Sequence, residues 1–171
     1  MSETKPFIIS KDLVMQAYKL IKANDNRRKK YSETGFVFLG YEFRCREVRN
    51  TGNNQVFMNF TPAVSKAAVN SMRAKIRNSN LRKRTDLSLD DVAIKYNPIL
   101  QGWLNYYGKY TRSGMYPVLR HFNKTLVTWS MRKFKKLKGR KMKAGNFLIG
   151  ISKRQPHLFA HWKMGMTGSF A

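Results

Sequence analysis

The last 80 residues of this 171-residue chain contain sixteen Lys and Arg residues and no Asp or Glu. All nine acidic residues lie at or before Asp91. A domain that needs charge only for solubility mixes both signs over its surface. This half of the chain contains no anionic partner for its own cations. The sequence therefore predicts that an external polyanion supplies the counter-charge.

The composition favours a folded, basic domain that binds nucleic acid. The formal net charge is +25 and the pI is about 10.6. Hydrophobic residues make up 42% and aromatic residues 13%, which is enough for a core and too aromatic for a disordered basic tail. RNA is the expected partner, with DNA as a second polyanion of the same kind. An anionic membrane surface is the lesser alternative.

Other classes of protein are excluded by what the chain lacks. No apolar run approaches the roughly 20 residues that span a bilayer, and the first residues lack the basic and apolar regions of a secretory signal. The single Cys45 excludes an internal disulfide and every multi-cysteine zinc motif. We expect a protein of the reducing cytoplasm, bacterial or organellar, with no membrane, metal or cofactor.

The order of sequence patterns predicts an α+β fold that is mainly α. Residues 10–23 carry an apolar helical stripe behind Ser10, a suitable N-cap. Residues 35–60 are aromatic and β-branched on both sides of a turn at 51–54, which predicts a two-stranded β-hairpin. About three to five helices are expected after it. The expected domains are 1–26 (N-terminal helix), 27–60 (basic link and hairpin) and 61–171 (helical domain).

Capping residues and prolines set the expected helix bounds. Thr61-Pro62 is expected to start a helix that ends near residue 79. Ser88 and Asp91 resemble a capping box. Pro98 is expected to interrupt the next helix, which restarts there. A long helix is expected over 114–138, closed by Gly139, and a shorter one over 144–153. The expected buried side of the long helix consists of Leu119, Phe122, Leu126, Trp129 and Phe134.

The run of cations over residues 132–143 is the strongest local signal. On one helix it would set like charges at i,i+4, as in Arg132 and Lys136, at a cost of about 0.2–0.5 kcal/mol a pair. A solvated helix face is the simpler interpretation, but such a face normally mixes signs. We therefore predict phosphate contact by this run and by residues 82–84. Residues 27–30 form a further basic cluster.

Aromatic residues beside Lys109 are candidates for stacking on bases. Trp103 and Tyr107 have the four-residue spacing of helical burial, so core packing is the simpler interpretation for them. Tyr106 and Tyr110 form a second pair and stay candidates. The predicted RNA-binding residues are Arg73, Arg77, Arg82, Lys83, Arg84, Tyr106, Lys109, Tyr110, Arg112, Arg120, Lys124, Arg132, Lys133, Lys135, Lys136, Lys138, Arg140, Lys141 and Lys143.

No residue is predicted to be catalytic. His157 and His161 have metal-ligand spacing but no third ligand nearby in the sequence, so packing is the simpler interpretation. Asp90 and Asp91 stand at a helix start, where carboxylates favour the dipole. Residues 145–150 have P-loop glycine spacing, but the required lysine is absent. His121 lies beside basic residues and stays open between packing and phosphate contact.

Five blocks, in order, resemble the maturase-specific region of group II intron reverse transcriptases. The first block is similar to the hairpin at the palm–thumb junction, and the rest to the thumb, or X domain. Residues 5–24, KPFIISKDLVMQAYKLIKAN, resemble the opening of the same proteins, ahead of the fingers. The five blocks are FVFLGYEFR (36–44), NFTPAVSKAAV (59–69), NPILQGWLNYYGKY (97–110), YPVLRHFNKTLVTWSMRKFKKLKG (116–139) and PHLFAHW (156–162).

The resemblance implies a thumb-like, RNA-binding maturase. Such a protein stabilises group II intron RNA for splicing, and the RNA carries the chemistry. The family's fingers and palm, with the paired aspartates of a Tyr-x-Asp-Asp motif, have no counterpart here, so no polymerase activity is expected. Three alternatives stay open: a degenerate, truncated reverse transcriptase remnant of a mobile element, a general nucleic-acid-binding protein, and a subunit that completes a palm-bearing chain. The oligomeric state is not predicted.

Overall fold

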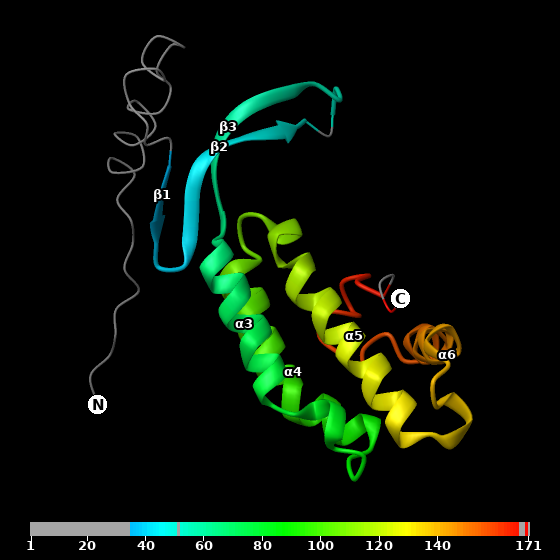
Figure 1. Cartoon of the computed structure of the whole chain (residues 1–171). Coiled ribbons are helices and arrows are strands. Elements are labelled where there is room, and N and C mark those ends of the chain that lie inside the picture. Colours follow the sequence, from blue (N-terminus) through cyan, green and yellow to red (C-terminus); the bar gives the residue numbers. More distant parts are fainter. Residues whose placement is uncertain (1–34, 51, 168–169, 171) are drawn as a thin grey trace. The chain divides into compact units, whose positions relative to one another are not determined.

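The computed structural model describes residues 35–50, 52–167 and 170. The expected helix at 10–23 and the basic cluster at 27–30 lie outside these residues. The described residues form a three-stranded sheet followed by four α-helices and three short 3-10 helices (Figure 1). The predicted class, α+β and mainly α, is confirmed. The chain divides into two compact units, Met1–Pro62 and Ala63–Ala171, which we describe separately.

The sheet contains one more strand than predicted. Its order is β1 (Gly35–Phe38), β2 (Tyr41–Arg49) and β3 (Val56–Val64). The segment expected as a single first strand is folded back at Leu39-Gly40, where φ is 48° and 79°. Positive φ at both central residues is what a two-residue type I′ hairpin turn requires. Type I′ turns usually have the sequence Asn-Gly. Because Leu-Gly occupies this turn, the sequence did not predict it.

Aromatic residues hold the first unit together. Phe36 of β1 pairs with Phe43 of β2 in the antiparallel register, and their rings stack with centroids 4.9 Å apart. Phe60 of β3 lies 6.2 Å from Phe43, and both are buried. Glu42 lies within 2.7 Å of Arg46, so an acid offsets a cation in this unit.

The first helix of the second unit begins later than predicted. Thr61-Pro62 lies in β3, and α3 (Lys66–Asn78) starts after Ser65, whose Oγ accepts a hydrogen bond from the N–H of Ala68 over 3.2 Å. Pro62 lies in β3, which is an edge strand of the three-stranded sheet, and edge strands tolerate proline. The predicted start at Thr61-Pro62 is therefore wrong, because these residues continue the strand.

The helix that follows is continuous through its proline. α4 (Leu89–Tyr107) opens with the predicted capping box: the N–H of Asp91 donates to Ser88 Oγ and the N–H of Ser88 donates to the carboxylate of Asp91. Pro98 lies inside the helix, so the predicted break is wrong. Packing explains the difference, because the turns before and after Pro98 bury one continuous face. The buried residues of that face are Val92, Ala93, Tyr96, Leu100 and Leu104.

The expected long helix ends five residues early. η2 (Arg112–Met115) leads into α5 (Tyr116–Lys133), and Phe134 is extended, with φ −105° and ψ 114°. The Phe134 ring packs edge-on against Trp129 and Phe147, which turns the chain out of the helix. η3 (Lys135–Leu137) and Gly139, with φ 71°, then lead to α6 (Lys141–Arg154).

This turn divides the basic run between the end of α5, η3 and the start of α6. The predicted cost of i,i+4 repulsion along one helix therefore does not arise for Arg132 and Lys136. Gly139 takes the expected left-handed conformation, but it follows η3 rather than the long helix.

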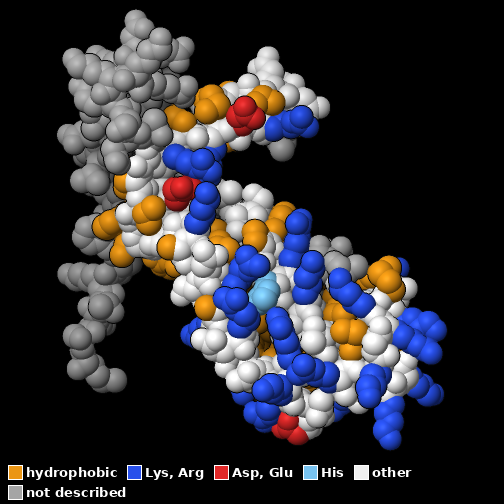
Figure 2. Space-filling view, in the orientation of Figure 1, with side chains coloured by type: hydrophobic (Ala, Val, Ile, Leu, Met, Phe, Trp, Pro, Cys, Tyr) orange, Lys and Arg blue, Asp and Glu red, His pale blue; other side chains and the backbone are white. Residues whose placement is uncertain are grey.

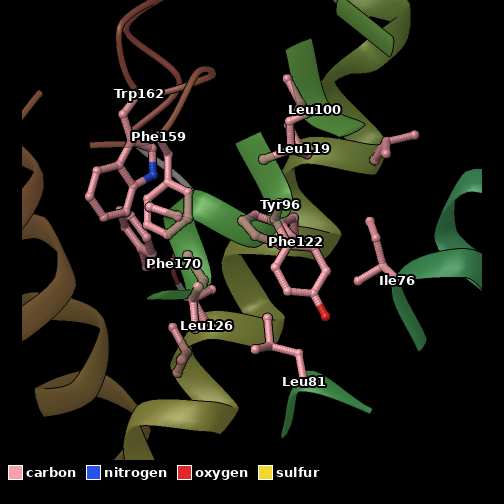
Figure 3. Close-up of a cluster of buried hydrophobic side chains, with 14 of the residues drawn as sticks. Ile76, Leu81, Tyr96, Leu100, Leu119, Phe122, Leu126, Phe159, Trp162 and Phe170 are labelled. Carbon is pink, nitrogen blue, oxygen red and sulfur yellow. The ribbon is translucent and has the colours of Figure 1, made fainter. Parts of the chain in front are cut away.

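α5 forms the centre of the helical unit. It packs against α3, α6 and η1 (Leu81–Lys83). Phe122 and Leu126 of α5 lie between Tyr96 of α4 and a C-terminal aromatic group that includes Phe159 (Figure 3). Leu119, Phe122, Leu126 and Trp129 are buried as predicted, and Phe134 is half-buried.

Candidate nucleic-acid interface

Three packed elements bring cations from distant parts of the sequence together. α3 buries Met72 and Ile76 and exposes Arg73 and Arg77, which are one helical turn apart. α5 packs against both α3 and η1, and α5 and η1 add further predicted residues. Lys and Arg side chains cover much of this unit's visible face, with few acidic side chains among them (Figure 2). The further residues are Arg82 and Lys83 of η1, and Arg120 and Lys124 of α5.

His121 of α5 lies within the field of the α3 and η1 arginines. Burial lowers the pKa of the half-buried His121, and the positive charges of Arg73, Arg82 and Arg77 lower it further. The Nε2 atom of His121 and the Nε atom of Arg82 are both buried, and neither has a hydrogen-bond partner among the described residues. His121 and the three arginines, which are far apart in the sequence, therefore lie close enough in the fold for their charges to interact.

Side chains of α5 fix the chain that follows η1. The indole Nε1 of Trp129 donates to the carbonyl of Arg84 over 2.8 Å. The ammonium of Lys133 donates to the carbonyls of Thr85 and Leu87, at 2.9 and 2.8 Å. Lys133, a predicted phosphate contact, thus directs its charge toward the protein's own backbone.

Arg84 is also engaged within the protein. Its guanidinium donates to Asp86, with an Nη2–Oδ2 distance of 2.8 Å. This hydrogen bond raises the pKa of Arg84 and lowers that of Asp86. Both side chains are exposed, so the pair contributes little to stability. Arg82 and Lys83 remain the cations of this loop that no described acid pairs in the structure.

The end of α4 and the turn that follows it carry the predicted aromatic residues. Tyr106 and Tyr110 are 46% and 59% exposed, whereas Trp103 and Tyr107 pack against the core, as predicted. The Lys109 ammonium lies 5.9 Å from the centroid of the Tyr110 ring. Exposed tyrosines beside a cation suit base stacking combined with phosphate contact. Arg112 is exposed in η2, the next element.

The remaining predicted cations lie at the turn from α5 to α6. No acid occurs in the first turn of α6, so cations stand at the positive end of its dipole, which is unfavourable in the absence of an anion. All of them are exposed. These residues are Arg132, Lys135, Lys136, Lys138, Arg140, Lys141 and Lys143.

One exposed cation that belongs to the same helix face was missed. Lys66 precedes Arg73 by seven residues and Arg77 by eleven, which places all three on one side of α3. That spacing in the sequence could have identified it.

The buried histidine has a structural role. His161 is fully buried, and its Nε2 lies 2.7 Å from the Oδ1 of Asn123. Burial lowers the pKa of His161 to about 3. The described part of the chain contains no group of three or more His, Cys, Asp or Glu residues able to hold a metal ion. No helix among the described residues is long and apolar enough to cross a membrane.

Comparison with known families identifies the segment that carries most of this surface. Residues 69–145 match the model of the group II intron maturase-specific domain. This segment is similar to that domain. The maturase-specific domain is not itself catalytic. The match includes α4, α5 and the turn to α6, and it confirms the resemblance of this region. No curated protein and no solved structure matches the chain.

Proposed function

We propose that this maturase-type chain binds group II intron RNA through the cations of α3, η1, α5 and the α5–α6 turn, and so assists splicing. The observation that carries the proposal is the acid-free half of the chain, residues 92–171, which overlaps the maturase-specific match and exposes all of its Lys and Arg side chains except Lys133. Group II intron RNA is the polyanion that this family acts on, and it supplies the missing counter-charge.

Charge neutralisation gives the physical mechanism. A compact RNA fold brings phosphates together, and a domain with a formal charge of +25 reduces their repulsion while it releases bound counterions. In A-form helices the phosphates and 2′-hydroxyls are accessible and the base edges of the major groove are not, so shape is recognised more than sequence. Tyr106 and Tyr110 would stack on unpaired bases beside such helices.

The reaction itself is assigned to the RNA. Two-metal nucleotidyl transfer needs carboxylates that hold both ions, and the sequence contains no Tyr-x-Asp-Asp motif. We therefore propose binding without polymerisation. The protein would act where such introns are transcribed, in a bacterial cytoplasm or an organelle.

A competition experiment tests the proposal. Fluorescence anisotropy of the full chain with a labelled group II intron RNA is measured against unlabelled intron RNA and against bulk transfer RNA. We expect salt-sensitive binding, at least tenfold better competition by the intron RNA, and faster splicing on addition of protein. Equal competition would identify a general nucleic-acid-binding protein. Extension of a primed template by the purified chain would contradict the assignment of chemistry to the RNA.

A further inference from the structure

Three buried side-chain nitrogen atoms in the helical unit lack hydrogen-bond partners among the described residues: His161 Nδ1, and two that lie on neighbouring elements. These two are His121 Nε2 on α5 and Arg82 Nε on η1, which packs against α5. A buried polar atom without a partner costs about 1–3 kcal/mol, so native structures pair nearly all of them. The main-chain carbonyl of Arg82 accepts a hydrogen bond from Arg132 of α5 over 3.3 Å, which ties the backbone of η1 to α5. The side chains of His121 and Arg82 can therefore still donate a hydrogen bond to an acceptor from outside the described residues.

The charges around these atoms have one sign. The groups that act on the His121 ring are Arg73 and Arg77 from α3 and Arg82 from η1, and no acid is among them. Asp86, the acid closest to η1 in sequence, is bound by Arg84. Arginine guanidinium groups suit phosphate oxygens because they donate paired N–H groups. The arrangement thus has donors and positive charge from three elements and lacks an acceptor.

We propose that Arg73, Arg77, Arg82 and His121 form a binding site for a single phosphate group, which the RNA backbone supplies. Arg82 Nε and His121 Nε2 donate to phosphate oxygens, and Arg73 and Arg77 add charge from the exposed side. The inference deepens the proposed function, and it rests on that function for the source of the phosphate. Free inorganic phosphate has the same chemistry and serves as the second source to be tested.

Proton uptake accompanies binding at this site. In the free protein, burial and three arginines disfavour the imidazolium form of His121, which lowers its pKa. A bound phosphate brings negative charge and an acceptor, both of which favour the imidazolium. Binding therefore takes up a proton, and the affinity for RNA rises as pH falls, by up to about tenfold per pH unit for one linked proton.

The first experiment follows the histidines directly. The full chain with labelled histidine is titrated by NMR in chloride, in inorganic phosphate at equal ionic strength, and with a short RNA duplex. We expect the pKa of His121 to rise in phosphate and with RNA, and the exposed His157 to change much less. Equal shifts at His121 and His157 in both ligands would overturn the site, because they would report only the general field of a basic protein.

The second experiment measures RNA affinity between pH 7.5 and 5.5 for matched variants. His121→Gln should lose most of the pH dependence, and His157→Gln should keep it. Arg73→Gln should weaken it and Lys75→Gln should not, since Lys75 is exposed on the same helix but is not among the charges acting on His121. The Arg73 and Lys75 variants change only exposed side chains and should fold. Their comparison therefore tests the phosphate site even if His121→Gln fails to fold.

The outcomes separate this site from the proposed function. RNA binding with an unchanged pH dependence in His121→Gln and Arg73→Gln would overturn the site and leave the function intact. No RNA binding, with a selective response of His121 to inorganic phosphate, would overturn the function and support the site. Absence of both would overturn both.

Discussion

The indole N–H of Trp129 donates a hydrogen bond to the main-chain carbonyl of Arg84, with 2.8 Å between nitrogen and oxygen. Trp129 is fully buried in the core, and the Arg84 side chain is exposed. A residue of the α5 core thereby fixes the backbone of the loop that presents Arg82 and Lys83. In this fold, the position of the cations depends on core packing.

Replacement of this tryptophan should loosen the loop. Trp129→Phe keeps most of the buried ring but leaves the Arg84 carbonyl without its donor, which costs about 1–3 kcal/mol of unfolding free energy. Trp103→Phe, on a half-buried tryptophan of α4, serves as the control. Urea denaturation followed by circular dichroism gives both values. Equal losses in the two variants would show that the hydrogen bond to Arg84 contributes nothing.

Replacement of Lys133 should lower stability, whereas replacement of Lys136 should lower RNA affinity. Lys133→Met removes the donor to two carbonyls, so it should lower the unfolding free energy by about 1–3 kcal/mol. Lys136→Met removes an exposed charge, so stability should change by no more than about 0.5 kcal/mol while RNA affinity falls. Thermal melts and anisotropy on both variants check this. The reverse assignment of effects would refute the structural role of Lys133.

Asn123 should be among the most sensitive polar residues of the core. Its Oδ1 accepts from Trp162 Nε1 over 3.3 Å and lies 2.7 Å from His161 Nε2, and its Nδ2 donates to the carbonyl of Met166. Because the indole can only donate, Oδ1 is an acceptor, and His161 carries its proton on Nε2.

Asn123→Leu would leave these buried groups unpaired at a cost of about 2–5 kcal/mol. Asn105→Leu, on an exposed site of α4, should cost far less. Differential scanning calorimetry measures both, and similar melting temperatures for the two variants would contradict the role of Asn123.

Acid should destabilise the protein through His161. The pKa of the buried ring is lowered to about 3, whereas an unfolded histidine titrates near 6.5. Between these values the unfolded state binds a proton that the native state excludes. The contribution of His161 is therefore complete above about pH 6.5 and is lost as pH falls, at up to about 1.4 kcal/mol per pH unit. Urea unfolding of the wild type and of His161→Gln from pH 7.5 to 4.5 measures this contribution. Parallel curves for the two proteins would contradict it.

Local signals were read correctly from the sequence. The Ser88–Asp91 capping box involves residues three apart, and the buried side of α5 follows helical spacing. The bounds that failed depended on distant partners. Pro98 lies within a helix because packing joins its two halves, and Phe134 ends α5 because its ring meets Phe147 of α6.

For the candidate site too, the sequence predicted local properties but not contacts between distant residues. Composition predicted that an external polyanion supplies the counter-charge of residues 92–171, and the structure leaves most of the Lys and Arg residues there exposed. Composition could not predict that Lys133 faces carbonyls 46 and 48 residues away, or that Arg73, Arg82 and His121 converge. Those relationships arise when α5 packs against α3 and against η1.

The loss of RNA affinity should depend on where the removed charges lie on the surface and not only on how many are removed. Arg120→Gln with Lys124→Gln removes two exposed charges from α5, and Lys95→Gln with Lys163→Gln removes two from exposed positions outside the predicted set. The slope of log affinity against log salt reports the phosphates neutralised, at about 0.9 for each in a duplex. The two double variants have the same net charge and therefore form a matched pair.

The most direct test of the account is this salt slope, measured for intron RNA with the full-length wild type and both double variants. We predict a steep linear decrease for the wild type, a slope shallower by about 1.5–2 for the α5 variant, and an unchanged slope for the control pair. A flat wild-type curve would contradict RNA binding by the basic surface. Equal losses in the two variants would show that the charge acts diffusely, without a defined surface.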